Sequence, residues 1–280
     1  MFRKRKNADK EEMTFWEHLD ELRSTLIWSI VAIAVCGTVA FIFKDILFDH
    51  ILLAPKEKDF ITYTLLCKLA NLVAMPSLCI DPSSFQIINI NLAGQFMSHM
   101  TISLVAGLIL SMPFVVWQFW RFIKPGLTDK EVRHTRGAVA VISLLFLTGV
   151  LFSYFIVVPL MVNFLGGYQV SEMVTNQIAL SSYTGSITMM TLLMGLLFEL
   201  PIVVIFLTKA GILTPSYLKK YRKHTVVAIL IIAGVITPSP DIFSQLIVAI
   251  PLYVLFEASV SISFGIYKRK QLELAAREGN

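Results

Sequence analysis

The chain has 280 residues, of which 56% are hydrophobic and only 15% are charged, and its mean hydropathy is +0.71. These values exclude an ordinary soluble domain and indicate an integral membrane protein. The formal net charge of +5 does not call for a nucleic-acid partner, because the distribution of basic residues among the loops accounts for it.

Six apolar segments follow one another along the chain. About 20 helical residues are needed to cross ~30 Å of hydrocarbon. Four segments reach about that length, namely residues 24–43, 98–120, 137–161 and 183–207. The last two segments, residues 225–237 and 242–256, are shorter. Residues 258–267 could lengthen the last segment or lie along the membrane interface. We therefore expect an all-α membrane protein with six transmembrane helices, the last two short, in a membrane domain spanning residues 24–267.

The basic residues are distributed very unevenly among the loops. Twenty of the 24 Lys and Arg residues lie in segments on one side of the expected membrane, namely residues 1–23, 121–136, 209–223 and 268–280. The other four, all Lys, lie in the loop 44–97. Because cytoplasmic loops carry the excess of Lys and Arg, both termini are expected in the cytoplasm, with 1–23 and 268–280 as cytoplasmic tails.

The long extracytoplasmic loop, residues 44–97, contains two of the three cysteines. Cys67 and Cys79 lie where a disulfide can persist, and we expect them to be paired. Two unpaired thiols remain the alternative, because sequence does not reveal their separation. Cys36 lies in the first apolar segment and is expected to be a free thiol.

A short amphipathic helix is expected just before the first span. Thr14 and Glu17 fit a capping box at its start. The positive end of the helix dipole is enough to explain an acid at Glu17, but it explains Glu21 less well, because Glu21 lies deeper in the helix, beside Arg23.

The second span ends in an aromatic and basic segment that leads to a second acid. Trp117, Trp120 and Phe122 suit a membrane interface, and a Pro-Gly turn follows at residues 125–126. The loop then brings Glu131 to the same cytoplasmic surface as Glu21. Capping of the next helix is the alternative account of Glu131, because acids are common in a first helical turn.

Glu199 is the only acidic residue in the apolar segment 187–207. Burying an ion in hydrocarbon costs about 2.5–3.5 kcal/mol on insertion scales, so such a residue usually faces protein or water and has a function. The alternative is a neutral acid packed inside the helix bundle. Pro201 leaves the carbonyl of Leu197 without its helical donor, and it can bend the helix beside the acid.

Four motifs, in order along the chain, carry a family resemblance. They are HLDELR at residues 18–23, P-x-x-x-W-Q-x-W-x-F-I-x-P-G-L from Pro113, FELP at residues 198–201 and TPSPDIFSQ at residues 237–245. Together they resemble the TatC family, the core receptors of the twin-arginine protein translocase, over residues 13–270. The chain departs from that family in its long first extracytoplasmic loop with the cysteine pair and in the basic extension before Met13.

The resemblance implies a glove-like helix bundle with an extracytoplasmic cap, in the bacterial inner (cytoplasmic) membrane. It implies a receptor that binds signal peptides with two adjacent arginines and transports folded proteins across the membrane by using the proton gradient. It also implies single-span partner subunits of the TatA/TatB type, contact with membrane lipid and an oligomeric complex. It implies no enzymatic activity, metal or cofactor.

The resemblance also assigns roles to residues. Glu21 and Glu131 form the signal-binding site, and Phe122 contributes to it. A planar guanidinium makes bidentate hydrogen bonds to a carboxylate that an ammonium cannot copy, so two acids on separate elements can select two arginines. We expect Leu127 to line an apolar border of this site and Arg23 to lie beside Glu21.

Further residues are assigned by resemblance to the membrane region. Glu199 is expected on a concave side of the bundle, near the contact with single-span subunits. Asp241 is expected to be functionally important, with Gln245 one turn further along, although helix capping also explains Asp241. Pro55 matches a family proline, and a rigid turn is enough to explain it.

The alternative function is a proton-coupled small-solute transporter with Glu199 as its carrier acid. Transporters of that kind tend to contain internal repeats. No convincing repeat relates the two halves of this sequence, and a single intramembrane acid is weak support for a proton-conducting path. An intramembrane enzyme is disfavoured because the sequence contains no phosphate-binding loop, nucleophile elbow or metal-ligand spacing.

Overall fold

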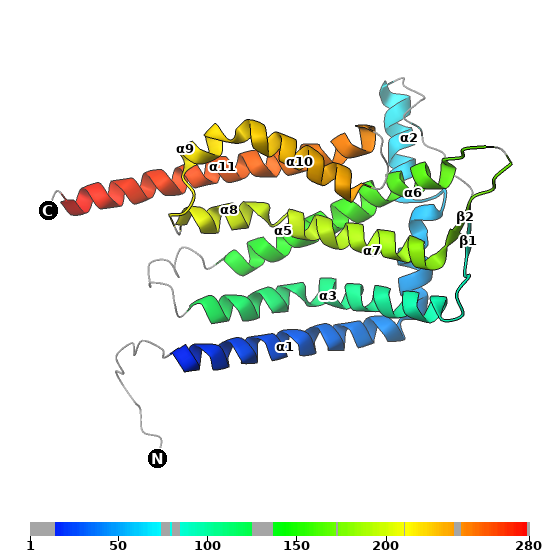
Figure 1. Ribbon diagram of the computed structural model, residues 1–280, viewed down its shortest axis with the longest axis horizontal. Coiled ribbons are helices and arrows are strands. Elements are labelled where there is room, and N and C mark those ends of the chain that lie inside the picture. The colour runs from blue at the N-terminus through cyan, green and yellow to red at the C-terminus, as the bar shows by residue number, and fades with distance from the viewer. Residues whose placement is uncertain are drawn as a thin grey trace, which may run out of the picture.

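The computed structural model describes residues 15–73, 79, 85–124, 137–171, 173–209, 211–237 and 242–278. Long helices lie side by side and alternate in direction, and shorter elements cover one end of the bundle (Figure 1). Helices that run along the bundle include α1 (Phe15–Ile42), α3 (Gly94–Ile123), α5 (Ala138–Phe152), α7 (Leu180–Leu197), α8 (Leu200–Lys209), α10 (Arg222–Ile236) and α11 (Ile242–Glu278). The remaining elements are η1 (Ile46–Leu52), η2 (Ala54–Lys56), α2 (Ile61–Val73), β1 (Gln86–Ile88), η5 (Ser153–Val157), α6 (Val158–Gly167), β2 (Gln177–Ala179) and α9 (Pro215–Lys220).

Five helical segments in the described part of the chain are long and apolar enough to cross a membrane. They are His18–Ile42, Gly94–Ile123, Ala138–Gly167, Leu180–Lys209 and Ser244–Lys268. This confirms the prediction of an all-α membrane protein. The helix α10 has only 15 residues and a length of about 22 Å. The protein has the six predicted transmembrane helices only if α10 also crosses the membrane.

The last helix corrects one expectation. The sequence predicts a short final segment at residues 242–256, but α11 continues without a break to Glu278 and has 37 residues. Residues 258–267 therefore lengthen the helix, and the expected boundary between residues 267 and 268 falls inside it. The physical reason is that no proline follows Pro251, and the basic tail is rich in Lys, Gln, Leu, Glu and Ala, all strong helix formers.

Close contact between α1 and α3 depends on two glycines. A methyl group added at Gly107 would lie only 2.5 Å from the Cα and N atoms of Gly37. Small residues at such a crossing let two membrane helices approach closely, so that packing and dispersion hold them together. A second crossing, between α5 and α7, is similar: a methyl group at Gly149 would lie 2.6 Å from the carbonyl oxygen of Met194.

Tyrosine hydroxyls attach η1 and η2 to the helix bundle. Tyr183 donates to the carbonyl of Leu52 at 3.0 Å. The single hydroxyl hydrogen of Tyr63 is shared between the carbonyls of Pro55 at 2.9 Å and Pro159 at 3.1 Å. Burial raises the pKa of Tyr63 to about 12, so the hydroxyl remains a donor at neutral pH. These bonds connect η1 and η2 to α6 and α7.

The remaining elements at this end are joined by pairing and by a disulfide. Strands β1 and β2 pair in parallel, with Ile87 opposite Ile178. Cys67 of α2 is disulfide-bonded to Cys79, the pair that the sequence predicts. We call this end, which holds η1, η2, α2, α6 and the two strands, the cap end.

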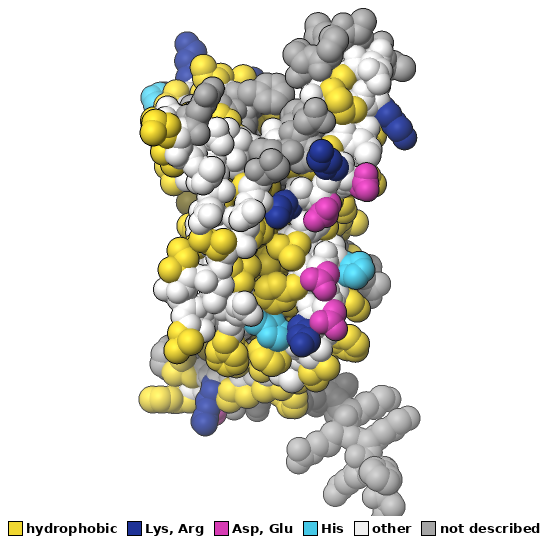
Figure 2. Space-filling view, turned by 90° about the vertical axis from the view of Figure 1, so that its right-hand side faces the viewer, with side chains coloured by type: hydrophobic (Ala, Val, Ile, Leu, Met, Phe, Trp, Pro, Cys, Tyr) yellow, Lys and Arg dark blue, Asp and Glu magenta, His cyan; other side chains and the backbone are white. Residues whose placement is uncertain are grey.

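The two ends of the bundle differ in charge. Figure 2 shows the cap end, where acidic and basic side chains lie close together beside apolar ones. Its described side chains include four Lys and four acids: Lys44, Lys56, Lys58 and Lys68, with Asp45, Asp49, Glu57 and Asp59. At the opposite end α1 begins, α3 and α8 end, and α11 finishes (Figure 1). Among the described side chains, the segments toward that end carry nine Lys and Arg residues but only three acids. The basic residues are Arg23, Arg121, Lys124, Lys209, Lys219, Lys220, Arg222, Lys223 and Lys268, and the acids are Asp20, Glu21 and Glu257. We call it the basic end.

Candidate functional site

The start of α1 and the end of α3 meet at the basic end. The imidazole of His18 stacks on the ring of Phe122, with 4.4 Å between ring centroids and 23° between ring planes. α1 and α3 pack against each other from this end of the bundle to the close crossing at Gly37 and Gly107. The predicted site residue Phe122 is thereby brought to the helix that carries Glu21.

Glu21 is exposed on α1, three residues after His18. Residues three apart in a helix lie on the same side, so its carboxylate is next to the stacked pair. Glu21 makes no ion pair with a described side chain, and Arg23 is exposed two residues further along. A carboxylate in this position is available to an incoming cation.

Two predicted members of the site, Glu131 and Leu127, lie outside the described residues. They belong to the segment 125–136. Both flanks of that segment, the end of α3 and the start of α5, lie at the basic end (Figure 1). The connection therefore starts and finishes at the same end of the bundle as Glu21.

Glu199 occupies a break between α7 and α8. Its backbone carbonyl accepts hydrogen bonds from the amides of Ile202 at 2.9 Å and Val203 at 3.2 Å, so it begins the first turn of α8. Pro201 in that turn cannot continue the helical ladder of α7, which agrees with the predicted bend. Both carboxyl oxygens are buried, and neither has a hydrogen-bond partner among the described residues. An acid without such a partner inside an apolar segment is unusual and often marks a functional position.

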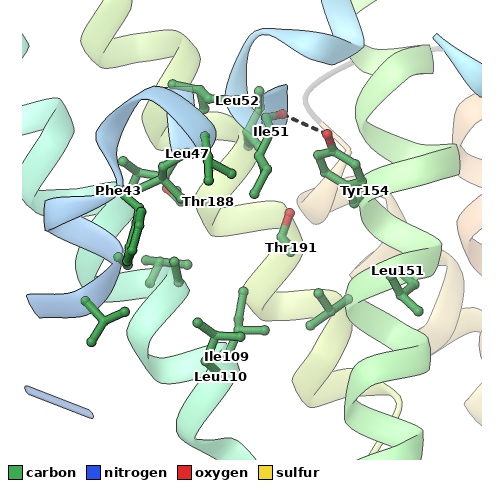
Figure 3. Close-up of a pocket in the computed structure, with 18 residues that line it drawn as sticks. Phe43, Leu47, Ile51, Leu52, Ile109, Leu110, Leu151, Tyr154, Thr188 and Thr191 are labelled. Carbon is green, nitrogen blue, oxygen red and sulfur yellow. Dashed lines mark hydrogen bonds between the residues drawn. The ribbon is translucent and has the colours of Figure 1, made fainter. Parts of the chain in front are cut away.

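An apolar cavity of about 430 Å³ lies between α1 and α3 on one side and α5 and α7 on the other, beside η1 (Figure 3). Two of its hydroxyls are satisfied: Tyr154 donates to the carbonyl of Ile51 at 2.8 Å, and Thr188 donates to the carbonyl of Thr184 at 2.8 Å. The hydroxyl of Thr191 also lines the cavity and has no partner among the described residues. The cavity thus offers an apolar surface with one free hydroxyl, two helical turns from Glu199.

The other predicted membrane residues have structural partners or lie outside the described region. The side-chain amide of Gln245 donates to the carbonyl of Leu230 at 2.8 Å and so connects α11 to α10. Pro55 is buried in η2, where its carbonyl accepts from Tyr63. Asp241 is outside the described residues.

Two residues stand out in the structure to which the sequence analysis gave no role. His18 is the first residue of the HLDELR motif, and its spacing from Glu21 could have placed it on the same helix face. Glu257 accepts hydrogen bonds from Arg222 and from Tyr253, which ties the start of α10 to α11. An acid inside an apolar segment was the available signal for Glu257. The described residues contain no group of three or more His, Cys, Asp or Glu side chains that could hold a metal ion.

Comparison with known proteins identifies the family of this chain. Residues 17–251 match the family model for Sec-independent protein translocase protein (TatC). A TatC from Blattabacterium sp. subsp. Periplaneta americana is 40% identical over 94% of this chain and 99% of its own length. TatCy from Bacillus subtilis is 32% identical over 95% of this chain and 94% of its own length.

Solved structures show the same fold. A crystal structure of the twin-arginine translocase receptor TatC superposes with a TM-score of 0.65 at 33% identity, covering 88% of this chain and 98% of that one. A second crystal structure of the same receptor, in the detergent DDM, gives a TM-score of 0.67 at 33% identity. The chain therefore belongs to the TatC family of Sec-independent protein translocase proteins.

Proposed function

We propose that this subunit recognises twin-arginine signal peptides at the basic end of the bundle, through Glu21 and Glu131, and that Phe122, Leu127 and Arg23 shape the surface around these acids. The observation that carries the proposal is the stacking of His18 on Phe122, which places the acid-bearing face of α1 against the end of α3. The loop with Glu131 starts directly after that end.

The chemistry of the site suits two guanidinium groups. Each carboxylate can accept two parallel hydrogen bonds from one arginine, whereas a lysine ammonium offers a point charge without that geometry. Exposed ion pairs contribute at most about 1 kcal/mol each. The stacked rings of His18 and Phe122 add an apolar surface beside the acids, which suits the hydrophobic part of a signal peptide.

The proposed orientation places the basic end in the cytoplasm of a bacterial cell and the cap end outside. The balanced charge of the cap end and the excess of Lys and Arg at the basic end support it. Both termini are then cytoplasmic, since α1 begins and α11 finishes at the basic end (Figure 1). A signal peptide would meet Glu21 before crossing the membrane.

The proposed partners are single-span subunits of the TatA/TatB type, which meet this chain in an oligomeric complex near Glu199. The buried, unpartnered carboxyl group of Glu199 supports this contact. A polar residue on a partner helix would give it a hydrogen bond, worth about 0.6 kcal/mol on average in measured membrane cases. The energy for transport of folded proteins is proposed to come from the transmembrane proton gradient. The alternative, a small-solute transporter, gains no support from the relatives.

The proposal is tested by crosslinking a signal peptide to the purified, membrane-reconstituted protein. Glu21→Gln and Glu131→Gln are each expected to lower binding of an Arg-Arg signal and to reduce its advantage over a Lys-Lys signal. Asp20→Asn, which removes the neighbouring exposed acid, is the matched control and should bind both signals as the unchanged protein does. Unaltered Arg-Arg binding in both glutamate variants would contradict the assignment.

A further inference from the structure

We infer that the junction of α8, α9 and α11 is a binding site for the headgroup of an anionic phospholipid in the leaflet at the basic end. The site consists of Lys219, whose ammonium group lies over the ring of Phe264, and of Lys209 and Lys268 on the two helices that meet there. These residues are not part of the proposed signal-binding site, and the inference does not depend on it.

Specific contacts join the three helices that carry these lysines. The hydroxyls of Thr208 and Ser263 lie 2.8 Å apart and are hydrogen-bonded, so the end of α8 is held against α11 beside Phe264. The ammonium group of Lys219 lies 5.4 Å from the centroid of the Phe264 ring, which brings α9 to the same place. Lys268 follows Phe264 by one helical turn on α11 and lies on the same side.

Their depth is that of the lipid phosphates. In the sequence, Lys209 is the first charged residue after the apolar segment 187–207, and Lys268 is the first after the apolar residues 258–267. The bond between Thr208 and Ser263 aligns the end of α8 with Phe264, and Lys268 lies one helical turn, about 6 Å, further along α11. Lysines at the ends of membrane helices extend their ammonium groups to the headgroup region.

The surroundings favour a lipid over a soluble anion or an acidic peptide. Phe264 and Tyr217 are 53% and 52% exposed, and aromatic side chains of this kind belong at the membrane interface. Glu257, an acid on α11, is already bound by Arg222 and Tyr253. No described carboxylate forms an ion pair with the three lysines. A cluster of positive charge at phosphate depth, with exposed aromatic rings beside it, is complementary to an anionic headgroup and its glycerol backbone.

The short helix α10 gives the site a second consequence. At about 22 Å, α10 is shorter than the ~30 Å hydrocarbon layer, and thinning of the bilayer beside it is one way in which a crossing α10 would be accommodated. A phospholipid held at the neighbouring junction of α8, α9 and α11 would fix the headgroup layer at the depth that the protein presents there.

The test measures lipid bound to the purified full-length protein by native mass spectrometry, in detergent micelles containing phosphatidylglycerol or phosphatidylcholine. The unchanged protein should prefer phosphatidylglycerol. The triple variant Lys209→Gln, Lys219→Gln, Lys268→Gln should lose this preference by at least about tenfold, since each lysine near a membrane surface contributes about fivefold. The control Lys44→Gln, Lys58→Gln, Lys68→Gln removes the same charge at the cap end and should keep the preference.

Further arms separate the possible outcomes. The variant with arginine at positions 209, 219 and 268 retains the charge and should keep the preference; its loss there would mean that packing, and not charge, was measured. Inorganic phosphate at matched ionic strength should not displace phosphatidylglycerol. Full displacement would mean that the lysines bind an adventitious ion only, and it would contradict a lipid site. An equal loss in the glutamine and cap-end variants would overturn the inference.

Discussion

At the scale of single residues, Glu199 combines a buried carboxyl group with the absence of any hydrogen-bond partner in the described chain. Such a group costs about 1–3 kcal/mol of stability. Glu199→Leu is therefore expected to raise the melting temperature of the isolated protein in detergent while it weakens co-purification of single-span subunits.

The glutamine variant separates charge from polarity at this position. Glu199→Gln keeps a buried polar group, so its melting temperature should stay close to that of the unchanged protein. A fall in melting temperature for Glu199→Leu would mean that the carboxyl group has a partner inside the chain, and it would remove the argument for an external one.

Tyr63 is the residue on which the attachment of η2 depends most directly. Tyr63→Phe leaves the carbonyls of Pro55 and Pro159 without this donor. We expect a loss of about 1–3 kcal/mol in the free energy of unfolding, since the affected groups are buried. Denaturant unfolding in detergent measures it, and Tyr168→Phe, at a tyrosine that is 62% exposed, should change little.

The raised pKa of Tyr63 adds a dependence on pH. The pKa of this hydroxyl is raised by burial from 10.0 to about 12, so the folded protein keeps the proton that the unfolded chain loses above pH 10. The stabilising effect is complete below pH 10 and falls as the pH rises toward 12. The difference in stability between the unchanged protein and Tyr63→Phe should shrink across that window; a constant difference would show that the hydroxyl is not buried in solution.

At the scale of elements, the signal-binding surface depends on the approach of α1 and α3. Gly107→Ala places a methyl group 2.5 Å from the backbone of Gly37, so the helices must separate. We expect a loss of about 1–3 kcal/mol, the range for overpacked sites, and weaker Arg-Arg signal binding because His18 and Phe122 move apart. Thermal unfolding and signal crosslinking measure the two effects.

A second helical glycine provides the matched control. A methyl group at Gly185 in α7 would meet no atom within 4 Å, and alanine stabilises a helix interior by roughly 0.5–1 kcal/mol relative to glycine. Gly185→Ala should therefore leave signal binding unchanged and stability unchanged or higher. If both alanine variants behaved alike, the close crossing of α1 and α3 would not be what positions the site.

At the scale of the whole molecule, the orientation depends on whether the 15-residue α10 crosses the membrane. We expect that it does, because α11 returns to the end of the bundle where α1 begins (Figure 1). A membrane-impermeant maleimide applied to intact cells should label Lys58→Cys at the cap end and should not label Asn280→Cys at the C-terminus. Cys36→Ser in both proteins removes the free thiol.

The opposite labelling result is informative as well. Labelling of Asn280→Cys from outside would place the two termini on opposite sides and show that α10 does not cross. Permeabilised cells, in which both cysteines should react, serve as the control for exposure of the C-terminal thiol.

Much of the fold follows from local patterns in the sequence. Apolar length predicts the long spans, Pro201 predicts the break between α7 and α8, and the distribution of Lys and Arg predicts the difference in charge between the two ends. The last span is longer than the segment 242–256 that we expected. A charged residue interrupts an apolar pattern, whereas only a poor helix former ends a helix.

What the sequence determines by itself is the membrane setting, the approximate spans and the residue types that can select arginine, because each depends on composition or on short spacing. The tertiary structure decided that His18 stacks on Phe122, that Gln245 bonds to Leu230, that β1 pairs with β2 and that Lys219 lies over Phe264. These contacts join residues 15 to more than 100 positions apart, and their geometry arises from the close crossing of helices. Local sequence carries no distance between such residues, so only the packed bundle could show them.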